Sequence, residues 1–141
     1  MKAYEIRPMR EEDINPALDL WSKAFRAGFS SGFDTHESIR RYLKRNPDLS
    51  TVALKGQELV GALMCGHDGR RGSIYHTAVD PSHRKKGLGQ AMTDRSLDAL
   101  RSIGITSGFL FIHTSNPGSE AFWRQTGWQV IDQVKYLYKE F

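Results

Sequence analysis

The chain has 141 residues, enough for one domain with a buried core, and its net charge is +4. No apolar run approaches the roughly 20 residues that a membrane-spanning helix needs, and the opening residues lack the apolar centre of a secretory signal. These features argue against a membrane-spanning protein. They predict a cytoplasmic protein with a single domain over residues 1–141 and no membrane partner.

The net charge limits the class of binding partner, and the single cysteine bears on the chemistry that the protein can use. A positive charge suits an anionic partner, yet the basic residues do not form the dense stripe of a dedicated nucleic-acid binder. A phosphorylated small molecule satisfies the charge equally well, so we predict no nucleic-acid partner. Cys65 is the single cysteine and lies in an apolar run, which predicts a buried thiol rather than a nucleophile.

The first third of the chain predicts a short strand and two helices. Residues 3–7 alternate enough for a strand. Apolar residues recur at spacings of three and four over residues 11–27, which is typical of a helix with one buried face. A second helix is expected over residues 35–46, capped by Asp34 or Thr35.

The rest of the chain predicts a sheet with helical connections. Two hairpins join three apolar, β-branched segments, and a helix, a strand, a helix and a final extended segment follow. The expected ranges are 50–54, 58–66, 73–79, 88–103, 108–113, 116–125 and 127–141. The order β-α-α-β-β-β-α-β-α-β predicts a mixed α/β fold, in which hairpin-linked strands pair antiparallel and helix-linked strands pair parallel.

One junction has the features of a phosphate site. The sequence HRKKGLGQAM runs from the end of a predicted strand into a predicted helix. A helix start offers unpaired N–H groups and a positive dipole, and Gly87 and Gly89 let an anion approach them. Arg84, Lys85 and Lys86 add positive charge. The spacing fits neither the nucleotide triphosphate loop nor the dinucleotide fingerprint, and alone it is equally compatible with a solvated basic turn.

Two motifs resemble a known family. The segment VDPSHRKKGLG resembles the acetyl-CoA loop of the GNAT superfamily of N-acetyltransferases, and Asn116 followed by AFWRQTGW resembles a second motif of that family downstream. The predicted element order also resembles the GNAT fold, a single domain with a mixed central sheet flanked by helices. The segment GHDGRRG is similar to the small YpeA-type bacterial branch.

The resemblance implies how acetyl-CoA binds. The main chain of Ala78 and Val79 would hydrogen-bond the pantetheine arm, and the main chain of the basic loop would hold the pyrophosphate. The loop residues are Arg84, Lys85, Lys86, Gly87, Leu88 and Gly89. Asn116 would contact the pantetheine arm, although it is equally suited to cap the helix that it precedes. Trp123 takes the place of the family's tyrosine acid, so it would orient the thioester or pack in the core.

The catalytic base is open. Relatives use a glutamate on the central strands, but residues 73–79 and 108–113 contain no carboxylate. His76, His113 and Tyr75 remain as candidates. Strand alternation predicts that Tyr75 and His76 point to opposite faces, so that at most one enters the cleft. We prefer His113, since it ends its predicted strand beside the expected thioester.

Aromatic and histidine residues complete the site predictions. Residues 26–34 combine glycines with Phe29 and Phe33, which predicts a mobile connection whose aromatic side chains contact the acceptor. The five histidines and Cys65 show no short paired spacing of the zinc-site kind, so no metal is predicted.

The sequence thus predicts an acetyl-CoA-dependent N-acetyltransferase that acts by direct attack. The acceptor would be a primary amine of a small molecule or of a protein N-terminus. The alternative is a non-catalytic acyl-CoA sensor or interaction module, suggested by the missing tyrosine and glutamate; an RNA-binding protein is a more distant one. A homodimer through the final strand is compatible with the pattern.

Overall fold

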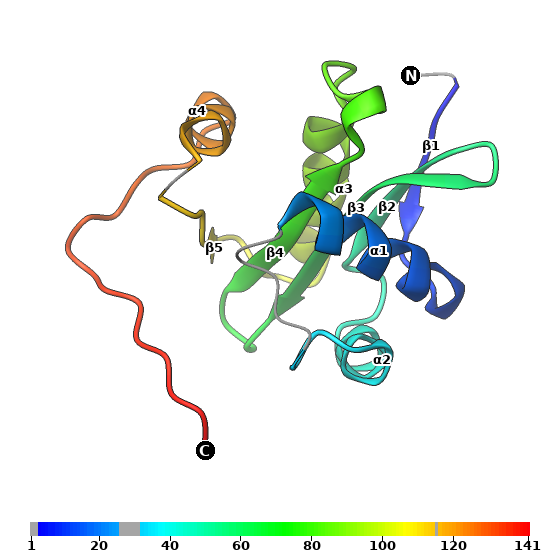
Figure 1. The fold of residues 1–141 in the computed structure, drawn as a ribbon. Coiled ribbons are helices and arrows are strands. Elements are labelled where there is room, and N and C mark those ends of the chain that lie inside the picture. The colour runs from blue at the N-terminus through cyan, green and yellow to red at the C-terminus, as the bar shows by residue number, and fades with distance from the viewer. Residues whose placement is uncertain (1–2, 26–31, 115) are drawn as a thin grey trace. The chain divides into compact units, whose positions relative to one another are not determined.

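A computed structural model describes residues 3–25, 32–114 and 116–141 (Figure 1). The chain divides into two compact units, Met1–Phe111 and Ile112–Phe141. The strands, all in the first unit, are β1 (Glu5–Pro8), β2 (Thr51–Lys55), β3 (Glu58–His67), β4 (Gly72–Val79) and β5 (Gly108–Leu110). The helices are η1 (Glu11–Asp13), α1 (Ile14–Ala24), α2 (His36–Arg45), η2 (Pro81–His83) and α3 (Leu88–Ser102) in the first unit and α4 (Pro117–Gln125) in the second.

The sheet has the strand order β1-β2-β3-β4-β5. Neighbours pair antiparallel from β1 to β4, whereas β4 and β5 pair parallel because α3 carries the chain back between them. This confirms the mixed α/β fold. The tight hairpin between β2 and β3 pairs Lys55 with Glu58, and Gly56 takes a φ of 62° in its turn.

Helices cover both faces of this sheet. Figure 1 shows α1 and α3 on opposite sides of the strands. Val52 and Leu54 pack against apolar residues of α1 and α2, including the fully buried Trp21. Thr51 points the other way, because its hydroxyl lies 2.7 Å from that of Ser96 on α3. The alternation of side chains along β2 thus divides the core into two layers.

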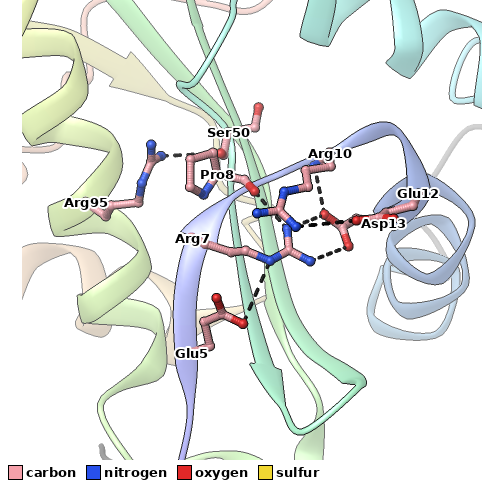
Figure 2. Close-up of polar contacts among 8 residues, drawn as sticks. All are labelled: Glu5, Arg7, Pro8, Arg10, Glu12, Asp13, Ser50 and Arg95. Atoms are coloured by element: carbon pink, nitrogen blue, oxygen red, sulfur yellow. Dashed lines mark hydrogen bonds and ion pairs between the residues drawn. The ribbon is translucent and has the colours of Figure 1, made fainter.

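A buried ion pair joins β1 to the start of α1 (Figure 2). The Arg7 guanidinium donates two hydrogen bonds to the Asp13 carboxylate, at 2.7 and 3.0 Å. The main-chain N–H of Arg10 donates a third, at 2.7 Å. This geometry satisfies the charge of Asp13 on several sides, which a buried carboxylate requires.

A second polar cluster fixes the connection from α2 to β2. Arg95 of α3 donates to the carbonyl of Asp48 at 2.7 Å and to the hydroxyl of Thr51 at 2.9 Å, and it also contacts the carbonyl of Ser50 (Figure 2). Burial lowers the pKa of Arg95 from its ordinary value. The guanidinium therefore serves to satisfy main-chain carbonyls where the chain enters the sheet.

The chain differs from the predicted elements near its end. The strand expected over residues 108–113 is shorter, Gly108–Leu110, and residues 128–141 form no strand or helix, so the predicted final strand is wrong. A strand requires a hydrogen-bonding neighbour as well as an alternating sequence, and the alternation alone does not supply one. Among the helices in the described ranges, none is long and apolar enough to cross a membrane.

Candidate active site

The loop of residues 84–89 leads from η2 into the first turn of α3, which begins at Leu88. The first four residues of the loop are exposed, whereas Leu88 is buried and anchors the start of the helix. Lys85 and Gly87 have φ angles of 61° and 79°. Gly87 is the N-cap of α3, and its left-handed backbone explains the need for glycine there. Closely spaced left-handed residues turn successive N–H groups to a common side, as in anion-binding nests.

The main-chain donors of this loop are available. Gly87 accepts the first helical hydrogen bond from the N–H of Ala91 at 3.0 Å, and no side chain caps the helix. In the described part of the chain, no main-chain hydrogen bond is donated by the N–H groups of residues 85–89. These donors and the positive end of the α3 dipole can therefore receive an anion.

The basic side chains around the loop differ in position. Arg84 turns back and donates from Nε to the carbonyl of Val79 at 3.0 Å, so it links the loop to the end of β4. Lys85 and Lys86 are exposed. Both lysines can contribute charge at the loop without occupying its N–H groups.

One edge of β4 is open over part of its length. The short strand β5 pairs only with the first residues of β4, and their pairing ends at Ile74 and Leu110. No other described strand lies beside residues 75–79 on that side. We call this stretch the open edge of β4. It leads directly to the 84–89 loop.

The ladder pattern decides which residue faces the open edge. Asp80 donates its N–H to the carbonyl of Val60 at 2.8 Å, so the main chain of Asp80 is turned toward β3. Because antiparallel residues alternate, Val79 turns its N–H and carbonyl to the open edge, and Ala78, paired with Ala62, turns its own toward β3. Of the two residues predicted to meet the pantetheine arm, Val79 is therefore the one whose main chain faces this edge, where its carbonyl accepts the hydrogen bond from Arg84.

A β-bulge interrupts β4 at His76. The register steps from Ala62↔Ala78 to Met64↔Tyr75, so a single residue of β3 lies opposite two residues of β4. His76 takes the left-handed conformation, with a φ of 55°. The bulge breaks the alternation of side chains along the strand.

This bulge overturns one prediction. Tyr75 packs against the core cluster that contains Trp21, and the His76 ring centroid lies 5.3 Å from that of Trp21. Both side chains therefore lie on the α1 face, not on opposite faces as strand alternation predicted. Tyr75 also lies 6.4 Å from Phe111, measured between ring centroids.

The imidazole of His76 has an aromatic and an acidic neighbour besides Trp21. The Phe25 ring lies 5.8 Å away, and Nε2 of His76 lies 3.1 Å from Oδ2 of Asp34. The side chains of His76 and Asp34 are 19% and 5% exposed. Sequence reasoning considered Asp34 only as a helix cap, but the structure gives that role to Thr35, whose hydroxyl accepts from the N–H of Ser38. No local sequence signal links Asp34 to a histidine 42 residues away.

The second unit contains three of the predicted site residues. Asn116 caps α4 by accepting a hydrogen bond from the N–H of Ser119 at 3.1 Å. Trp123 is buried and packs edge-to-face against Phe122 and Trp128. His113 is exposed and lies three residues beyond the end of β5.

The two phenylalanines predicted to contact the acceptor have different status. Phe33 is 57% exposed and precedes Asp34 in the chain. Phe29 lies outside the described residues.

Cys65 is unsuited to nucleophilic chemistry. It is fully buried on β3, and burial raises the pKa of its thiol to about 12. A thiol with this pKa is protonated at neutral pH, and the thiolate is the reactive form.

Comparison with known proteins agrees with these features. Residues 14–128 match the acetyltransferase (GNAT) family. Over 130 residues the chain is 30% identical to an acetyltransferase of Pectobacterium atrosepticum, an alignment that covers 92% of this chain and 91% of that protein. The chain therefore belongs to the GNAT family, and it is an acetyltransferase. The YpeA-type branch stays a prediction.

Solved structures share the fold. Ard1 from Thermoplasma volcanium superimposes with a TM-score of 0.81 at 22% identity, over 92% of this chain and 84% of that one. The PaiA N-acetyltransferase from Thermoplasma acidophilum, solved in complex with coenzyme A, superimposes with a TM-score of 0.79 at 17% identity, over 93% and 92%. These likenesses confirm the GNAT fold.

Proposed function

We propose that this acetyltransferase uses acetyl-CoA and acetylates a primary amine of a small molecule or of a protein N-terminus. The observation that carries the proposal is the set of N–H groups at residues 85–89, which donate no main-chain hydrogen bond within the described residues and lie where the open edge of β4 meets the start of α3. The coenzyme A bound in the PaiA structure, which shares this fold, supports an acyl-CoA in the same role.

In this proposal the main chain holds the cofactor. The N–H groups of residues 85–89 bind the pyrophosphate, and Lys85 and Lys86 add charge. The main chain of Val79 binds the pantetheine arm as the strand would bind an added neighbour. Ala78, the preceding residue, turns its main chain toward β3. The family resemblance adds Asn116 and Trp123 as cofactor contacts.

The reaction is direct attack on the thioester. The amine nitrogen forms a bond to the carbonyl carbon, the bond between carbon and sulfur breaks, and coenzyme A leaves as a thiolate of low basicity. The proton released by the amine passes to a base. No acyl-enzyme is needed, which agrees with the high pKa of the Cys65 thiol.

We assign the base to His76. It is the one predicted histidine that lies on β4 itself, at the bulge beside the open edge, and an imidazole is chemically suited to accept a proton from an amine. His113 and Tyr75 are retained as alternatives, and replacement of each one distinguishes them. Phe33 and Phe29 are proposed acceptor contacts.

Two measurements test the function. Calorimetric titration with acetyl-CoA should give saturable heat with one cofactor per chain. Release of coenzyme A thiol over a panel of amines should then identify acceptors, with acetylation verified by mass spectrometry. Absence of saturable binding by folded protein contradicts the proposal, and binding without turnover on any amine favours an acyl-CoA sensor.

We also propose that the protein is cytoplasmic. A further proposal is a homodimer formed through residues 127–141. Sedimentation of the full chain and of a chain truncated after Gly127 tests the dimer. A monomer in both cases contradicts it.

A further inference from the structure

A buried acidic residue outside the predicted site lies against the proposed base. Asp34 follows Phe33 in the connection that leads into α2, and its side chain is only 5% exposed. A buried carboxylate needs partners that stabilise its charge. The partner at 3.1 Å is Nε2 of His76, which lies 42 residues later in the chain but next to Asp34 in space.

We propose that Asp34 is a positioning residue that fixes the tautomer and the orientation of His76. This inference rests on the proposed function, in which His76 takes the proton of the attacking amine. An ionised carboxylate only accepts hydrogen bonds, so Nε2 of His76 must donate to it. In the neutral imidazole the lone pair then lies on Nδ1, which becomes the atom that receives the proton.

The surroundings hold both partners in place. Trp21 is fully buried, and its indole N–H donates to the carbonyl of Ala62 on β3 at 3.4 Å, so the ring beneath His76 is anchored to the sheet. Asp34 immediately precedes a capping box, in which Thr35 and Ser38 exchange hydrogen bonds at 3.0 and 3.1 Å. The carboxylate therefore extends from the fixed start of a helix toward a ring packed on a fixed surface.

The backbone of His76 points to a functional role for this pair. A left-handed conformation is unfavourable in a residue other than glycine, and such positions cluster at functional sites. The bulge turns the imidazole onto the α1 face, where it meets Asp34, instead of leaving it in the regular alternation of the strand. The strained residue and the buried carboxylate thus meet at one hydrogen bond.

The decisive experiment is a double-variant cycle on kcat/KM. Asp34→Asn keeps the shape of the side chain and removes its charge. We expect it to lower kcat about 10- to 100-fold and to leave the KM for acetyl-CoA unchanged. This fall in kcat is smaller than the roughly 10²- to 10⁴-fold loss expected when a general base is removed entirely. His76→Asn keeps a residue that tolerates left-handed backbone. In the His76→Asn background, Asp34→Asn should have no further effect, because Asp34 acts through His76. Asp19→Asn on the exposed surface of α1 is the matched control and should retain full activity.

The ring tautomer is measured independently of activity. Nitrogen NMR of the imidazoles at alkaline pH, with the His76 signals assigned by their loss in His76→Asn, should show the proton on Nε2 in the native protein. Asp34→Asn should increase the population with the proton on Nδ1.

The outcomes separate this inference from the proposed function. If the native enzyme acetylates amines but Asp34→Asn keeps full kcat, or loses as much activity in the His76→Asn background as in the native one, the inference is wrong and the function stands. If no amine is acetylated, the proposed function fails, and the tautomer still decides whether Asp34 orients His76. A proton on Nδ1 in the native protein overturns the inference in either case.

Discussion

The protein buries two aspartates to nearly the same extent, and their partners give them different consequences. The side chain of Asp13 is 6% exposed and that of Asp34 is 5% exposed. Asp13 accepts two hydrogen bonds from Arg7 and one from a main-chain N–H. Asp34 has a hydrogen bond to His76. An arginine stays charged at every physiological pH, whereas a histidine can take up and release a proton near neutrality.

The difference teaches that burial of a carboxylate does not by itself indicate a site. The Asp13 pair joins β1 to α1 and serves stability, since the permanently charged Arg7 holds the carboxylate through two hydrogen bonds. The Asp34 pair lies at a strained bulge beside an unpaired strand edge. Variants that separate loss of function from loss of stability should therefore separate the two regions.

The largest effect is expected from Gly89→Glu. A glutamate in the first turn of α3 favours the helix through its dipole, so the fold should persist, while its charge repels the pyrophosphate. We expect the Kd for acetyl-CoA to rise at least about 1,000-fold, or about 4 kcal/mol. Calorimetry measures it, and Gly89→Gln separates bulk from charge. Unchanged affinity in the folded variant would falsify the placement of the cofactor.

Asp13→Ala should affect stability rather than function. It leaves Arg7, whose side chain is 12% exposed, as a largely buried charge with its main partner removed, and we expect the free energy of unfolding to fall by about 3 kcal/mol. Urea denaturation measures the change. The double variant Arg7→Met/Asp13→Ala should recover much of it, because both charges are then gone. A loss below about 1 kcal/mol would show that the pair is not a structural anchor, and a changed Kd for acetyl-CoA would show that it is not only structural.

His76→Asn should have the opposite profile. Loss of the base should lower kcat about 100-fold, as is typical of general-base removal, while the Kd for acetyl-CoA and the midpoint of thermal unfolding stay close to the native values. Steady-state kinetics on the best amine measures it. His113→Asn is the matched variant: if that replacement causes the loss and His76→Asn does not, the base is His113.

The smallest effect is expected from Cys65→Ala. Activity should stay within about twofold, since direct attack needs no thiol nucleophile. The thiol pKa is raised by burial from 9.0 to about 12, so between these pH values the thiol ionises only in the unfolded chain. The native protein should therefore lose stability as pH rises through that range, and Cys65→Ala should lose less of it. An acetylated Cys65 detected by mass spectrometry during turnover would contradict direct attack.

Much of the fold follows from local sequence features. Neighbouring residues are enough to predict α1 and α3, because their apolar side chains recur at spacings of three and four. They also predict the hairpin at Gly56 and the loop that ends at Gly87. The family motif then gave this loop its predicted role in binding the cofactor, which stays a proposal. The C-terminal segment was harder, because residues 128–141 have an alternating pattern without a strand to pair with among the described residues.

The sequence by itself determined the order of the elements as far as α4, the glycines at the start of α3 and the family, because each depends on residues close together in the chain. Only the tertiary structure decided that His76 sits on a bulge, since a bulge is a mismatch between β3 and β4 and neither strand encodes it alone. It also decided that Asp34 meets His76 across 42 residues. Such a contact forms only when the start of α2 and the middle of β4 fold against the same core layer.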